Sequence, residues 1–206
     1  MASGRNQWRG ARPRRPYSAR AAALKALLGL DKGRAERVRD ALDAAHLHGR
    51  DQALAYELAH GVVRRERLLD HVLGGLAHRG LPRDPALMWA LRLGTYQLLF
   101  VGGMPAHSAV DETVSLVRTN KGFANALLRR VAECVDSREP APDETIGELR
   151  LGPARTLRLP TPLPEDECER AAIVHSLPSF LVARWRAEHG REAMLQIAEA
   201  ASTVPS

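Results

Sequence analysis

The sequence predicts an all-α protein: a helical bundle, followed by a proline-rich linker and a small helical segment. Three observations favour this class. Apolar residues return at three- and four-residue spacing, typical of helices, over most of residues 18–135. Helix-capping residues, glycine and proline separate these stretches. No region is rich in strand patterns, and only Thr156–Leu159 resembles a short extended piece.

The first two expected helices occupy residues up to about 47. Ser18 is a suitable N-cap for a helix with an alanine and leucine stripe, and Asp31-Lys32-Gly33 is a suitable stop. A weaker helix is expected from Arg34 to Leu47. These elements supply the first apolar faces of the bundle.

Two further helices are expected between residues 51 and 80. Asp51 can cap the first, in which Leu54, Leu58 and Val62 lie four residues apart. The second follows the charged segment 64–67 and ends near residue 80. Gly61 indicates either a close approach of another backbone or a bend.

The next helices have clearer boundaries. Asp84-Pro85 provides a capping carboxylate followed by proline in the first helical position, and Gly102-Gly103 ends the apolar stripe that follows. Another helix is expected from Pro105 to Arg118. After a break at Lys121-Gly122, a further helix covers Phe123–Val135.

Composition changes after Asp136, where six prolines fall between residues 137 and 164. This stretch is predicted to be a linker. Helical patterns return at Glu165–His175, Ser179–His189 and Arg191–Ala201. The expected organisation is a disordered basic tail (1–16), a helical domain (17–136), the linker (137–164) and a helical segment (165–206).

The excess of positive charge is concentrated at the N-terminus. The net charge is +6, and the first twenty residues hold six arginines and no acidic residue. The remaining basic residues equal the acidic ones in number. A short arginine-rich tail is typical of segments that contact phosphates, although a solvated tail without a role would have the same composition.

Motifs for catalysis are missing from this sequence. It contains no glycine-rich nucleotide loop, nucleophile elbow or zinc-binding pattern, and Cys134 and Cys168 lie too far apart to suggest a metal pair. We therefore expect no catalysis by this chain alone, and no cofactor or metal site in it. Without a membrane-spanning or signal segment, we expect a soluble, cytoplasmic protein.

Three local clusters carry the remaining information: residues 57–64, residues 92–99, and residues 105–112 together with 121–130. Gly94 within a helix indicates a tight helix crossing. Arg92 beside a core stripe is expected to pair with Glu57 or Asp111, or else to contact a ligand. The third cluster surrounds the helix after Lys121, whose basic residues form either an RNA-contacting surface or a solvated face.

These clusters resemble the NusB family of transcription antitermination factors, and more closely the NusB-like N-terminal domain of the ribosomal RNA small-subunit cytosine-C5 methyltransferase B (Sun/Fmu) family. The resemblance covers about residues 19–135. The matching segments are Glu57-Leu58 with Gly61-Val62, Arg92 to Leu99, Pro105 to Glu112, and Gly122 to Arg129. The segment Leu177 to Trp185 is similar to a helix that follows the linker in the methyltransferases.

The resemblance implies an RNA-binding, substrate-recognition portion of an S-adenosylmethionine-dependent methyltransferase whose catalytic half is absent here. The implied partner is small-subunit ribosomal RNA. The candidate RNA-contacting residues are Arg12, Arg14, Arg15, Arg20, Lys121, Asn125, Arg129 and Arg130. No catalytic residue is implied within this chain.

Two alternatives remain open at this point. The domain is a protein-interaction module that docks against the missing catalytic half or a ribosomal protein, or it is an antitermination factor itself. A large exposed apolar patch on the helices after the linker would favour docking.

Overall fold

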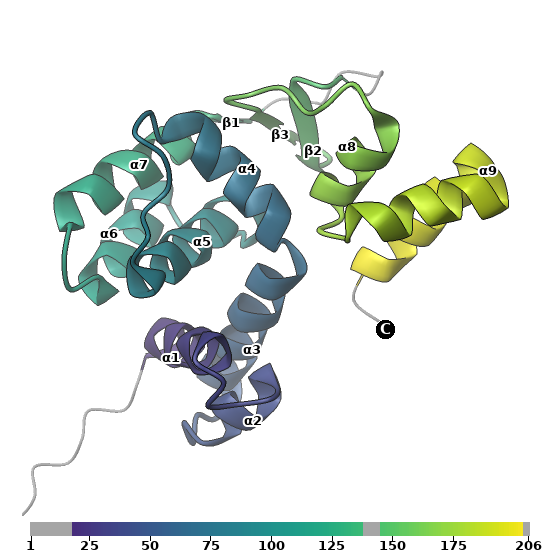
Figure 1. The fold of residues 1–206 in the computed structure, drawn as a ribbon. Coiled ribbons are helices and arrows are strands. Elements are labelled where there is room, and N and C mark those ends of the chain that lie inside the picture. Colours follow the sequence, from purple (N-terminus) through teal and green to yellow (C-terminus); the bar gives the residue numbers. More distant parts are fainter. Residues whose placement is uncertain (1–17, 138–144, 204–206) are drawn as a thin grey trace, which may run out of the picture.

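The computed structural model describes residues 18–137 and 145–203. Within these ranges, seven helices form the bundle and a small sheet and two helices follow (Figure 1). The bundle contains α1 (Ala19–Asp31), α2 (Val38–Asp43), α3 (Gly49–Arg64), α4 (Glu66–Leu76), α5 (Pro85–Phe100), α6 (Ala106–Leu116) and α7 (Lys121–Glu133). The remaining elements are β1 (Val135–Asp136), β2 (Glu148–Gly152), β3 (Arg155–Arg158), α8 (Glu167–Val174) and α9 (Ser179–Ser202). The predicted all-α class is confirmed for the bundle.

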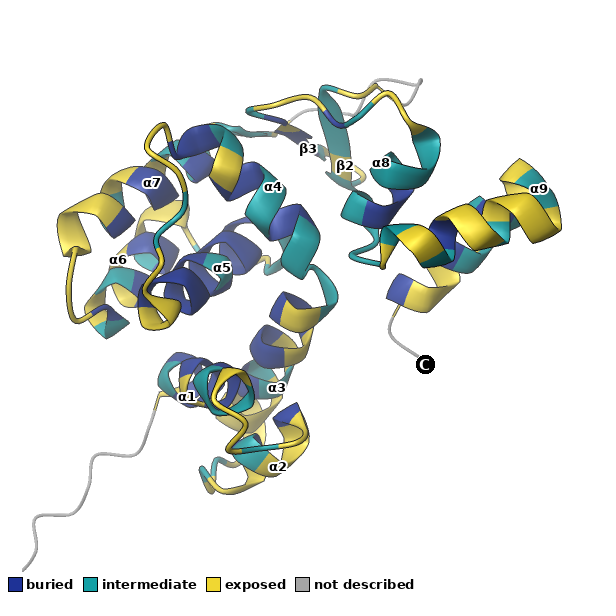
Figure 2. Ribbon diagram, in the orientation of Figure 1, coloured by how far each residue is buried: buried dark blue, intermediate teal, exposed yellow. Residues whose placement is uncertain are grey.

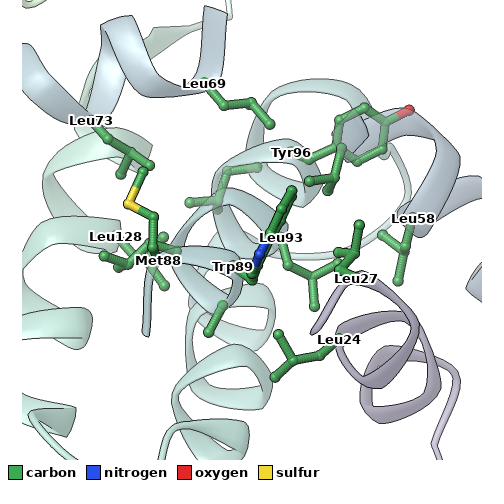
Figure 3. Packing of buried hydrophobic residues seen from close by; sticks show 14 of the residues in the cluster. Leu24, Leu27, Leu58, Leu69, Leu73, Met88, Trp89, Leu93, Tyr96 and Leu128 are labelled. Atoms are coloured by element: carbon green, nitrogen blue, oxygen red, sulfur yellow. The ribbon is translucent and has the colours of Figure 1, made fainter. Parts of the chain in front are cut away.

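Helix α5 is the centre of the bundle. Twelve of its sixteen residues are buried, and it packs against α1, α3, α4, α6 and α7. A helix that is apolar on all sides must be covered on all sides, which explains why the other helices surround it (Figure 2). Its side chains Trp89 and Leu93 meet leucines from α1, α3, α4 and α7 in one core (Figure 3).

Two glycines allow the closest helix contacts. A Cβ at Gly61 of α3 would overlap the ring of Tyr96 on α5, and a Cβ at Gly94 would lie 2.8 Å from a methyl group of Leu128 on α7. The tight crossing predicted from Gly94 is confirmed. At Gly61, the approaching group is an aromatic ring rather than a backbone.

Several predicted helix ends were wrong by a few residues. Ser18 does cap α1, since its hydroxyl accepts from the backbone N–H of Ala21 at 3.2 Å. Asp51, by contrast, lies in the first turn of α3 and does not cap it, because the helix already begins at Gly49. The weak helix predicted over 34–47 contracts to the six residues of α2, since only Val38 and Leu42 are buried there.

The linker predicted over 137–164 needs correction in its described part, because residues 145–164 form a hairpin and add buried leucines to the core. Residues 138–144 lie outside the described residues. Strands β2 and β3 form an antiparallel hairpin, with β1 on the other side of β3. Leu157 is fully buried, and Leu159 and Leu163 join the same core as the helices. The extended piece predicted at Thr156–Leu159 is confirmed by β3. The prolines of this stretch include Pro153, which lies in the turn between β2 and β3.

Helices α8 and α9 pack around a smaller second cluster, and α8 rests against α4 (Figure 1). Arg67, at the start of α4, donates to the Leu177 carbonyl and to the Ser179 hydroxyl, and pairs with Glu169 at 2.7 Å. Neighbouring Arg65 donates to the Val174 carbonyl at 3.1 Å. These arginines therefore bind the C-terminal end of α8 to the bundle.

Helix α9 bends where the sequence predicts a separation between two helices. Gly190 has φ 81° and ψ 179°, a conformation that strongly favours glycine. Across the described ranges, no helix combines the length and apolar composition needed to cross a membrane.

Candidate nucleic-acid interface

Helix α7 presents three of the predicted RNA-contacting residues on one face. Lys121, Asn125 and Arg129 follow each other at four-residue spacing, which places them in one stripe along the helix. Lys121 and Arg129 are exposed, and Asn125 is half-buried. Arg129 donates through Nε to Oδ1 of Asn125 at 3.2 Å. We call these three residues the α7 stripe.

The stripe begins at an open helix N-terminus. Asn120 occupies the N-cap position in the left-handed conformation, with φ 58°, and its side chain makes no capping bond. The first turn contains no acidic residue, and exposed Arg118 precedes it. Uncapped backbone N–H groups and the helix dipole favour an anion at such a position. Lys121 therefore stands where a phosphate group is electrostatically favoured.

Arg130 lies apart from this stripe and contacts α4, and its predicted RNA contact stays a prediction. The side chain points toward α4, where Nη1 donates to the Leu76 carbonyl at 2.8 Å. This bond satisfies a carbonyl in the last turn of α4 that lacks a helical partner. Arg130 thus joins α7 to α4.

Arg20 is engaged inside the bundle, so its predicted phosphate contact stays a prediction beside a structural role. It is only 8% exposed. Its Nε donates to Oε1 of Gln97 at 2.5 Å, and its Nη1 pairs with Glu112 at 2.6 Å. The guanidinium therefore connects α1 to α5 and α6.

Arg12, Arg14 and Arg15 lie outside the described residues. The position of α1 nevertheless shows where the arginine-rich segment joins the bundle. Arg20, in the first turn of α1, also reaches Sδ of Met104 at 3.3 Å, in the connection between α5 and α6. The chain therefore enters α1 beside this connection.

The pairing predicted for Arg92 was wrong in its partners. Arg92 binds both carboxylate oxygens of Asp70, at 2.8 and 2.7 Å, and pairs with Glu66 at 2.7 Å. Burial alone would lower the pKa of Arg92, but hydrogen bonding to Asp70 and the nearby carboxylates raise it overall. Both partners come from α4, whose position beside this face of α5 could not be read from helical spacing.

Glu57, one of the two partners predicted for Arg92, instead accepts a hydrogen bond from the hydroxyl of Tyr96 at 2.5 Å. Burial and this hydrogen bond raise the pKa of Tyr96. The contact lies where α3 and α5 cross at Gly61. This hydrogen bond joins the two helices at their crossing, and it engages both the phenol and the carboxylate.

A cavity of about 350 Å³ lies between the α5–α6 connection, the C-terminal end of α7 and β3. Arg155, on β3, lines it and donates through Nη2 to the Leu98 carbonyl at 2.8 Å. Sequence reasoning missed this site, because it placed residues 137–164 in a linker. The extended piece at 156–159 was the only available signal.

The two cysteines are free thiols, and neither belongs to a reactive cluster. Burial raises the pKa of Cys134, which disfavours the thiolate. Over residues 18–137 and 145–203, no three histidine, cysteine, aspartate or glutamate side chains are placed to hold a metal ion.

Comparison with known proteins identifies one family and several relatives. The profile described as the NusB family matches residues 17–133. The ribosomal RNA small subunit methyltransferase B of Thermus thermophilus is 41% identical over 129 residues, covering 56% of this chain and 31% of that protein. A probable protein of the same name from Bacillus subtilis is 26% identical over 189 residues, covering 87% of this chain and 37% of that protein.

A transcription antitermination protein NusB, from Nitratidesulfovibrio vulgaris, is also similar. It is 30% identical over 93 residues, covering 42% of this chain and 56% of that protein. The chain spans about a third of the length of the two methyltransferase relatives.

Proposed function

The chain belongs to the NusB family, and from this premise we propose that it is the RNA-binding, substrate-recognition portion of a ribosomal RNA small-subunit methyltransferase. The observation that carries the proposal is the α7 stripe, which begins at an uncapped helix N-terminus. Phosphate contacts dominate affinity for nucleic acid, and this surface offers cations and backbone donors together.

The extent of the similarity favours a methyltransferase over an antitermination factor. The match to the Bacillus subtilis protein covers 87% of the chain, so it continues beyond residue 133, where the NusB profile ends. The match to the antitermination protein covers less than half of the chain. The hairpin and helices α8 and α9 therefore point to the methyltransferase branch.

The described residues do not fit S-adenosylmethionine, the methyl donor expected for such an enzyme. Their sheet is antiparallel and three-stranded, with the order β1-β3-β2. A nucleotide-like cofactor normally docks at the carboxyl ends of parallel strands in an open α/β sheet. We assign no catalytic step to these residues and propose that they position RNA.

The test is RNA binding by a variant that loses two charges of the stripe. Lys121→Gln with Arg129→Gln should weaken binding of a small-subunit ribosomal RNA hairpin and flatten the salt dependence by about two units, one for each phosphate contact. Fluorescence anisotropy over a salt series measures both effects.

The matched control removes the same charges elsewhere. Lys32→Gln with Arg37→Gln changes one exposed lysine and one exposed arginine at the α1–α2 connection. This control should keep most of the affinity and the original salt slope. Equal losses in both double variants would show a general charge effect and contradict the assignment to α7.

A docking role is the second candidate, favoured by the surface of α9. Phe180 is 75% exposed, and Leu181 and Trp185 beside it are only half-buried. A partner bound at this position would cover the Phe180 ring, but a single exposed ring is smaller than the contiguous apolar patches that mark protein contacts. If the wild-type chain fails to bind the hairpin at low salt, docking becomes the better account.

A further inference from the structure

We propose that the cavity between the α5–α6 connection, α7 and β3 accepts one unstacked nucleobase of the bound RNA. The proposal rests on the RNA-binding function above and adds a specific subsite to it. Proteins that recognise single-stranded RNA loops commonly splay bases out and stack them on side chains, including the planar guanidinium of arginine.

The size and lining of the cavity suit a flat ring. Its volume of about 350 Å³ lies at the lower end of the range for small-molecule pockets. The walls combine apolar side chains, among them Leu98 and Val101, with the polar side chains of Gln97, Ser137 and Arg155. Met104, from the connection, and Ala132, from α7, add further apolar surface. Methionine adapts its shape to different partners.

We assign recognition of the polar edge of the base to Arg155. Its Nη2 is held by the Leu98 carbonyl at 2.8 Å, which fixes the guanidinium at the cavity wall. Among the described residues, no carboxylate pairs with it. We assign its remaining donors and its planar face, which contact no other described carboxylate, to the edge or ring of a base.

The cavity also lies between the α7 stripe and the start of α1. Gln97 and Met104 line it and both contact Arg20, so the start of α1 stands beside it. Ala132 lies eleven residues after Lys121, on the same side of α7 as the stripe, at a rise of about 16 Å. RNA that follows the stripe toward the start of α1 therefore passes the cavity.

Gly102→Leu tests the proposal by filling the cavity. Gly102 lines it, a Cβ there meets no atom within 4 Å, and its φ lies outside the left-handed region. Gly74→Leu is the control, because Gly74 on α4 is equally open and does not line the cavity. The probes are the ribosomal RNA hairpin and a copy whose loop nucleotides lack their bases.

Gly102→Leu should raise the Kd for the intact hairpin about tenfold, the usual effect of losing one stacked base, without changing the salt slope. The hairpin with a baseless loop should bind wild type and Gly102→Leu equally. Arg155→Lys keeps the charge but not the planar group, and should reproduce the loss at an unchanged melting temperature.

Two contrary outcomes are distinguishable. If Gly102→Leu and Arg155→Lys bind the intact hairpin as tightly as wild type and Gly74→Leu, the base subsite is wrong while RNA binding stands. If wild type itself does not bind the hairpin at low salt, the proposed function and the subsite are both overturned.

Discussion

Arginine side chains in this molecule serve two different purposes, and burial separates them. Arg20, Arg92 and Arg130 satisfy oxygen atoms on neighbouring helices. Arg129 stays exposed on the α7 stripe. The sequence shows the same charge at all four positions, because burial depends on which helices become neighbours. The sequence therefore could not separate Arg20 and Arg130, which have partners inside the bundle, from the exposed residues of the α7 stripe.

Replacing Arg20 by methionine should destabilise the bundle. The change keeps an apolar stem but leaves Gln97 without one of its partners and Glu112 without its ion pair. Because Glu112 is half-exposed, we expect a loss of about 2 kcal/mol in unfolding free energy, below the value for a fully buried pair. Urea unfolding measures it, with Lys121→Met as the exposed control. A loss no larger than that of the control would contradict the structural role.

Gly61→Ala should destabilise the protein by about 1–3 kcal/mol, the usual cost of overpacking, because the new methyl group overlaps the Tyr96 ring. Gly74→Ala tests a helical position with open space around it. Its Cβ meets nothing, so alanine should stabilise by up to about 1 kcal/mol. Thermal unfolding of the two variants should therefore shift in opposite directions, and shifts of the same sign would contradict the packing at the α3–α5 crossing.

The raised pKa of Tyr96 predicts a loss of stability at high pH. Burial and the bond to Glu57 keep the phenol protonated in the folded state above its ordinary pKa of 10.0. The folded state therefore holds a proton that the unfolded state releases, and stability falls as pH rises above about 10. Tyr96→Phe should be less stable at neutral pH and should show a shallower decline between pH 9 and 11. If the unfolding free energies of the two proteins fall equally between pH 9 and 11, the prediction is contradicted.

At the scale of elements, the helices were more predictable than their ends or the hairpin. The apolar spacing of α5 and the Asp84-Pro85 start can be read locally, and Asp84 does cap α5 by accepting from Ala86. The hairpin could not be predicted in the same way, because Leu157 and Leu159 are buried by contacts with helices distant in sequence. Six prolines in that stretch dominated the local pattern.

The contact of α8 and α9 with the bundle depends on Arg67, which predicts a local effect. Arg67→Met removes the bonds to Leu177, Ser179 and Glu169. Amide hydrogen exchange over residues 167–202 should accelerate by about tenfold, equivalent to about 1.4 kcal/mol, while α5 keeps its protection. Arg184→Met, which breaks only an exposed pair with Glu188, is the control. Unchanged exchange in Arg67→Met would show that apolar contacts alone hold the two helices.

At the scale of the whole molecule, charge and family membership indicate the same function by independent routes. The sequence places six arginines in the first twenty residues, and the structure adds a basic stripe on α7. The NusB resemblance could be recognised from ordered motifs because they encode the crossings around α5. The cavity beside β3 could not be, since its walls come from three separate parts of the chain.

RNA binding by the intact chain tests the central claim most directly. Fluorescence anisotropy with a small-subunit ribosomal RNA hairpin would compare residues 1–206 with a copy that starts at Pro16 and lacks Arg5, Arg9, Arg12, Arg14 and Arg15. We predict salt-dependent binding that weakens in the shortened copy, with the salt slope flatter by about one unit for each arginine that contacts a phosphate. Failure of both copies to bind at low salt would contradict the RNA-binding function.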